Sequence, residues 1–167
     1  MATETGWQGR FFDDFEVGDI YQHKIGRTII DPDEVWFAGI TTAQNPMHYN
    51  RDYASRTKFG RQTVNAPFTN AVVTGMSVND ISMNGTDLGW DYIKVPNPVF
   101  IGETIYAQSE IIDKEECADA PGKGIITVKS IGITSQGKVI LEMQRKVLVW
   151  KREFAPRYDY FPEFKTE

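Results

Sequence analysis

The sequence predicts an α+β fold in which a curved antiparallel sheet wraps around one long helix. One long apolar segment with helix-start signals occupies residues 66–78. Most of the chain after it consists of strand-length runs of β-forming residues separated by turn signals. One further strand and one short helix precede the apolar segment. This order of elements favours a sheet packed on the long helix.

The long helix has a well-marked amino terminus. Residues 66–78 are apolar around much of the helix circumference, which is typical of a helix surrounded by its own fold. Asn65 is expected to cap its start. Pro67 suits the first turn, because an amide there has no intrahelical partner.

The segment before this helix predicts a strand followed by a short helix. Residues 11–19 mix aromatic anchors with turn formers and lead into a strand over residues 20–29. Asp31 is expected to act as the cap of a helix over residues 32–41, because an early proline and first-turn carboxylates follow it. The buried side of that helix is expected to consist of Val35, Trp36 and Phe37.

The second half of the chain predicts strands. A polar turn is expected at residues 84–87, and Gln136 and Gly137 suit a hairpin turn. The segment 122–124 separates two other long strands. The expected strands cover residues 90–95, 103–113, 124–135 and 138–150.

Length and composition indicate one compact domain over residues 1–167, with an aromatic tail over residues 152–167 that packs on the domain or on a partner subunit. The 41% hydrophobic and 13% aromatic content argues against a long disordered region.

A net charge of −5 without a long basic block argues against nucleic acid as a partner. Cys117 is the only cysteine, which excludes an intrachain disulfide. With no signal peptide and no membrane-spanning stretch, we expect a cytoplasmic protein and no membrane partner.

The segment 43–48 carries the strongest chemical signal. It reads Ala-Gln-Asn-Pro-Met-His and follows the short helix. His48 can act as an acid or a base near neutral pH, and Asn45 can hold a water molecule or fix the loop. The alternative is that His48 satisfies backbone groups in an irregular loop, which Asn45 and Pro46 merely shape. His23, in the first strand, has no comparable neighbours in the sequence and is expected to be structural.

Four segments, in this order along the chain, carry a family resemblance: residues 11–19, 45–48, 65–75 and 98–104. They resemble the MaoC-like dehydratases, in particular the branch that acts on mesaconyl- or methylmalyl-type acyl-CoA. The resemblance covers most of the chain and implies the hot-dog fold, a homodimer and an acyl-CoA thioester as substrate.

The resemblance also assigns roles to residues. The family element is Asp-x-Asn-Pro-x-His, which Asn45 and His48 match, while the Asp position falls on Ala43. The resemblance places the amide that stabilises the thioester oxyanion at Ala66, where an ordinary helix start is the alternative. Without a carboxylate at residue 43, either His48 acts alone as base and then acid, or a distant Asp or Glu completes the pair.

Other residues near this segment are candidates for substrate binding. Ala43, Gln44, Pro46 and Asn65 are expected to line the acyl site. Three arginines after His48 form a basic cluster that either contacts the CoA phosphates or belongs to a solvated loop. They are Arg51, Arg56 and Arg61.

The expected activity is therefore that of a hydro-lyase, which adds water to 2-enoyl-CoA or dehydrates 3-hydroxyacyl-CoA. The alternatives are a catalytically impaired acyl-CoA-binding or regulatory subunit, and a hot-dog thioesterase. No cofactor is expected, since the chain has two histidines, no cysteine cluster and no Gly-rich phosphate loop. A serine hydrolase has no support, because there is no Gly-x-Ser-x-Gly element.

Overall fold

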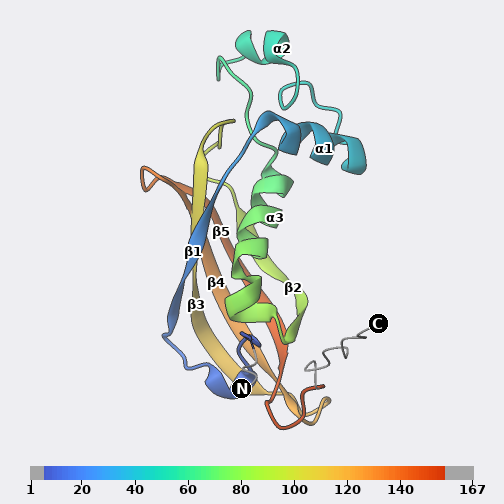
Figure 1. The fold of residues 1–167 in the computed structure, drawn as a ribbon, viewed down its shortest axis with the longest axis vertical. Coiled ribbons are helices and arrows are strands. Elements are labelled where there is room, and N and C mark those ends of the chain that lie inside the picture. The colour runs from blue at the N-terminus through green and yellow to red at the C-terminus, as the bar shows by residue number, and fades with distance from the viewer. Residues whose placement is uncertain (1–5, 157–167) are drawn as a thin grey trace, which may run out of the picture.

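The computed structural model describes residues 6–156, in which one sheet curves around one helix (Figure 1). A short 3₁₀ turn, Phe12–Asp14, precedes the first strand, and a π-helical turn, Val78–Ser82, continues the long helix. The main elements are β1 (Ile20–Thr28), α1 (Asp31–Thr41), α2 (Arg51–Ser55), α3 (Ala66–Ser77), β2 (Gly85–Lys94), β3 (Thr104–Glu116), β4 (Lys123–Thr134) and β5 (Val139–Trp150).

The sheet is antiparallel throughout, with the strand order β1-β3-β4-β5-β2. The predicted α+β architecture is confirmed, because α3 packs against β1, β3, β4 and β5. Figure 1 shows that α1 and α2 lie at the end of the molecule where α3 begins. The hairpin predicted at Gln136 and Gly137 joins β4 to β5, and Gly137 has a φ of 77°, which glycine adopts without a steric penalty.

Two apolar clusters form the core. The first lies between α3 and the sheet, where Val73 and Leu141 are fully buried and Phe68 and Met76 pack against them. The second lies at the other end of the sheet, where the aromatic residues of the predicted anchor segment close the fold. Its members are Phe12, Phe15, Ile81, Ile111, Ile126, Val128, Val147 and Val149.

The predicted boundaries of α1 were nearly right, but its predicted cap and packing were wrong. Asp31 is the first helical residue rather than the cap, and Ile30 precedes it in an extended conformation. The side chain of Trp36 is 73% exposed and Val35 is also exposed, whereas Glu34 is 1% exposed. The reason is that α1 packs through Glu34 and Phe37, which are three residues apart on one face. Phe37 packs on Phe68 of α3, with ring centroids 5.2 Å apart.

The predicted turn at residues 84–87 was also wrong, because β2 begins at Gly85. Gly85 is opposite Val149 in β5, and a Cβ atom on Gly85 would lie only 2.8 Å from Val147 Cγ1. The glycine therefore permits close approach of a side chain rather than a turn. The aromatic tail predicted over residues 152–167 lies largely outside the described residues, including its segment 158–164.

No helix among residues 6–156 is long and apolar enough to cross a bilayer.

Candidate functional site

The loop after α1 is held by its own backbone and by Asn45. Thr42 ends the helix in the left-handed conformation, with a φ of 56°. Asn45 Oδ1 accepts a hydrogen bond from the Met47 N–H at 3.1 Å, and its carbonyl accepts from the His48 N–H at 3.2 Å. Pro46 accepts from the backbone of Asn50 at 2.9 Å. Asn45 therefore shapes the turn that presents His48.

The imidazole of His48 is half-buried and fixed on one side. Its Nδ1 lies 2.8 Å from the carbonyl oxygen of Thr63, and Gln62 Nε2 donates to the His48 carbonyl at 3.1 Å. A carbonyl oxygen can only accept, so Nδ1 carries a proton in this contact. In the neutral ring, Nε2 then has a free lone pair and can accept a proton.

The same segment continues into the start of α3. Asn65 occupies the position before the helix, as predicted, but its side chain forms no capping hydrogen bond. Instead its backbone N–H donates to Glu34 Oε1 at 3.0 Å. Ala66 and Pro67 form the first turn and are exposed. The Ala66 N–H has no partner within the helix and suits binding of a partial negative charge.

Glu34 is the residue at this site that sequence reasoning missed. It is fully buried, and its Oε2 has no hydrogen-bond partner among the described residues. Burial raises the pKa of its carboxyl, whereas the Asn65 N–H and the nearby His48 act to lower it. In the sequence, Glu34 was one of several carboxylates in a first helical turn, a pattern typical of a solvated helix start.

The predicted site residues fall into two groups. His48, Asn65 and Ala66 come together through residues 62–65, and Ala43 lies half-buried in the adjoining loop. Gln44 is exposed, and its carbonyl accepts from the Tyr49 hydroxyl at 2.9 Å.

The three arginines do not converge with that group, because each is exposed and contacts its own carboxylate. Arg51 pairs with Asp31 at 2.7 Å, and Arg56 pairs with Asp52 at 2.7 Å within α2. The Arg61 guanidinium is 3.8 Å from the Glu103 carboxylate, and it also stacks on the ring of Phe100.

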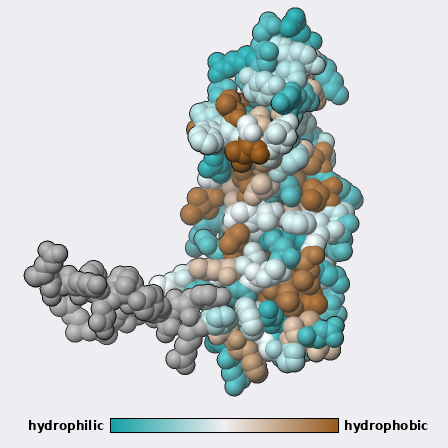
Figure 2. Space-filling view, turned by 90° about the vertical axis from the view of Figure 1, so that its right-hand side faces the viewer, coloured by the Kyte–Doolittle hydropathy of each residue, from teal (hydrophilic) through white to brown (hydrophobic). Residues whose placement is uncertain are grey.

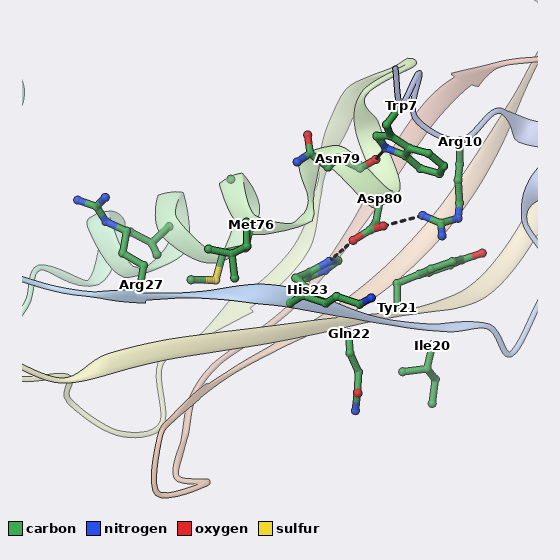
Figure 3. A pocket seen from close by; sticks show the side chains of 14 residues that line it. Trp7, Arg10, Ile20, Tyr21, Gln22, His23, Arg27, Met76, Asn79 and Asp80 are labelled. Atoms are coloured by element: carbon green, nitrogen blue, oxygen red, sulfur yellow. Dashed lines mark hydrogen bonds and ion pairs between the residues drawn. The ribbon is translucent and has the colours of Figure 1, made fainter. Parts of the chain in front are cut away.

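A pocket of about 1120 Å³ lies between β1 and the second half of α3 and contains none of the predicted site residues (Figure 3). His23 lies beside it, with Nδ1 2.9 Å from Asp80 and Nε2 2.9 Å from the Ser109 hydroxyl. Burial would raise the pKa of Asp80, but hydrogen bonds from His23 and Arg10 hold it below its usual range. Both ring nitrogens of His23 are thus used within the fold, as expected for a structural histidine.

A family model described as mesaconyl-CoA hydratase matches residues 2–157. The chain belongs to the mesaconyl-CoA hydratase family. Curated relatives in this group include the mesaconyl-CoA hydratase of Cereibacter sphaeroides, 28% identical over 88% of this chain and 43% of its own length. The β-methylmalyl-CoA dehydratase of Chloroflexus aurantiacus is 29% identical over 92% of this chain and 43% of its own length. The (R)-specific enoyl-CoA hydratase of Rhodospirillum rubrum is 26% identical over 83% of this chain and 91% of its own length.

Solved structures confirm the hot-dog fold. A protein from Chloroflexus aurantiacus described as a putative MaoC domain dehydratase superposes with a TM-score of 0.84 at 26% identity, over 98% of this chain and 47% of that one. A Mycobacterium tuberculosis protein described as having a double hotdog fold superposes with a TM-score of 0.79 over 93% of this chain and 47% of its own. This chain therefore spans about half the length of the first curated relatives that it matches, which are CoA-thioester hydratases and dehydratases by name.

Proposed function

We propose that this chain is a hydro-lyase that adds water to 2-enoyl-CoA thioesters or removes it from 3-hydroxyacyl-CoA thioesters. The observation that carries the proposal is the contact between His48 Nδ1 and the Thr63 carbonyl. This contact leaves Nε2 of the neutral ring available as a base, in a chain whose family members are hydratases.

The reaction requires two proton transfers. His48 Nε2 removes a proton from water as the water oxygen bonds to the β-carbon. The π electrons of the enoyl group move toward the thioester oxygen, which becomes an enolate. The imidazolium then gives its proton to the α-carbon, so no net proton is gained or lost. His48 thus acts as base and then as acid.

The enolate oxygen requires a donor, and the Ala66 amide is our candidate. It belongs to the first turn of α3, where the unpaired N–H groups and the helix dipole favour negative charge. The segment 62–65 holds His48 and leads directly into this turn.

The CoA phosphates are proposed to contact Arg51, Arg56 and Arg61. These side chains are exposed on α2 and just after it. Figure 1 shows that α2 lies at the same end of the molecule as α1, and His48 lies in the loop between these two helices. Each phosphate contact would compete with the carboxylate that each arginine contacts in the free chain.

The test is a panel of short, branched and medium-length 2-enoyl-CoA esters. Loss of the conjugated absorbance is followed together with the release of free CoA. Hydration supports the proposal, whereas release of CoA without hydration identifies a thioesterase and contradicts it.

A second candidate function is an acyl-CoA-binding subunit without turnover. Ala43 favours it, because no carboxylate stands at the family's Asp position. The length of the relatives also favours it, because this chain matches only 43% of the Cereibacter sphaeroides hydratase. A second hot-dog domain could supply the carboxylate that Ala43 lacks. This candidate predicts binding of the enoyl-CoA panel with no loss of conjugation.

We also propose that two copies of this chain pair through the free edge of β2. No strand among residues 6–156 pairs with the outer edge of β2. Figure 2 shows apolar patches on the side of the molecule where β2 lies in Figure 1. The exposed apolar residues are Leu88, Trp90 and Ile93 in β2 and Val95 directly after it.

Light scattering during size-exclusion chromatography is expected to give a mass twice that of one chain. Replacing Ile93 with aspartate should shift the mass toward that of the monomer, because it places a charge in an apolar interface. A wild-type mass equal to one chain at all concentrations would contradict the pairing.

A further inference from the structure

Glu34 combines three properties that a residue needed only for packing would not have. It is 1% exposed, it is ionisable, and its Oε2 has no hydrogen-bond partner among residues 6–156. A buried carboxylate oxygen without a partner is costly, and few native side chains leave one unsatisfied. The other oxygen, Oε1, accepts from the Asn65 N–H at 3.0 Å.

Glu34 and His48 are attached to the same short segment, residues 62–65. Thr63 accepts from the His48 ring, Gln62 donates to the His48 carbonyl, and Asn65 donates to Glu34. The carboxylate therefore reaches the vicinity of His48 from α1, a different element from the loop that contains residue 43. Burial raises the pKa of the Glu34 carboxyl, and the nearby charge of His48 acts in the opposite direction.

We propose that Glu34 is the carboxylate partner of His48 and replaces the one that Ala43 cannot supply. This inference rests on the proposed hydro-lyase function. Glu34 is a positioning residue, because it acts through His48 and not on the substrate. While His48 holds the proton taken from water, the negative charge of Glu34 balances the positive charge of the imidazolium. Glu34 itself neither gains nor loses a proton in the cycle.

A purely structural role is the competing explanation. In that role, Glu34 only accepts from Asn65 and fixes the start of α3. The Glu34→Gln variant separates the two roles, because glutamine has nearly the same volume and keeps an acceptor oxygen for the Asn65 N–H. It removes the charge and replaces the oxygen that has no partner with an NH2 group.

Steady-state hydration by wild type and Glu34→Gln is the experiment, with the best substrate of the enoyl-CoA panel. We expect kcat to fall by about 10²-fold, as for the loss of a positioned acid-base partner. We expect KM to change by less than about threefold, because the substrate contacts remain. Below the pH optimum, kcat should fall less steeply with decreasing pH in the variant than in wild type. The reason is that His48 and Glu34 must both be deprotonated in wild type, and only His48 in the variant.

Asp33→Asn is the matched control. It also turns a carboxylate of α1 into an amide, next to Glu34, and keeps the acceptor for the Ile30 N–H. It removes the charge that pairs with Arg27, and the loss of this negative charge acts to lower the pKa of Glu34, which keeps Glu34 ionised. We expect wild-type kcat from it. If wild type is active and Glu34→Gln has the wild-type kcat, the role of Glu34 is overturned but the proposed hydro-lyase function is not. A wild type that does not hydrate any ester would overturn the proposed function and this inference with it.

Discussion

Replacing His48 with alanine is expected to lower the rate of hydration by about 10²–10⁴-fold, the usual contribution of a positioned acid-base group. The physical reason is that Nε2 is the atom proposed to take the proton from water and return it to the α-carbon. The contact of Nδ1 with Thr63 fixes both the orientation of the ring and its tautomer. Stopped-flow or steady-state absorbance measurements on an enoyl-CoA ester will report the loss.

The control for this variant is Met47→Leu, which changes the neighbouring half-buried side chain but preserves its apolar character and volume. It should retain wild-type turnover. In urea unfolding, both variants should have the wild-type free energy of unfolding to within about 1 kcal/mol, the scale of ordinary substitutions outside a core. Hydration that survives the His48→Ala change would remove His48 from the mechanism.

Replacing Asp87 with alanine is expected to destabilise the fold by about 3–5 kcal/mol, because it leaves a buried guanidinium without its counter-charge. Arg145 in β5 is fully buried, and its Nη1 donates to both carboxylate oxygens of Asp87 at 2.9 and 3.0 Å. Its Nη2 donates to the Ser77 hydroxyl at 2.7 Å. Burial lowers the pKa of Arg145, and Asp87 opposes that effect. The pair thus joins β5, β2 and the end of α3.

Urea unfolding of Asp87→Ala and of the double variant Asp87→Ala/Arg145→Met tests this explanation. Methionine fills much of the same space without a charge, so the double variant should recover at least half of the lost stability. A loss below about 1 kcal/mol in Asp87→Ala, the value of an exposed ion pair, would show that the pair is not a structural link.

Much of the fold could be predicted because local signals and tertiary packing agree. The start of α3 at Ala66 follows from Asn65 and Pro67, and the β4–β5 hairpin follows from the turn at Gly137. The short α2 escaped prediction because its five residues contain no helical repeat of apolar side chains. The start of β2 was missed because Gly85 was interpreted as a turn residue.

The candidate site was harder to predict because it depends on how elements dock. The sequence pointed to His48, and the structure adds that its ring is fixed on Thr63. The inward orientation of Glu34 depends on the contact of α1 with the start of α3, which no local pattern encodes. Arg145 posed the same difficulty, because it lies between Gln144 and Lys146 in β5 and resembles a solvated side chain.

The most direct test of the central claim compares hydration of one enoyl-CoA ester by wild type and by Ala43→Asp. With the base at His48 and its carboxylate partner at Glu34, no carboxylate is required at residue 43. We expect wild type to hydrate the ester and the rate of the variant to differ by less than about tenfold, or about 1.4 kcal/mol in the barrier. A wild type that binds the ester without turnover, beside an Ala43→Asp variant that hydrates it, would contradict the proposed roles of His48 and Glu34.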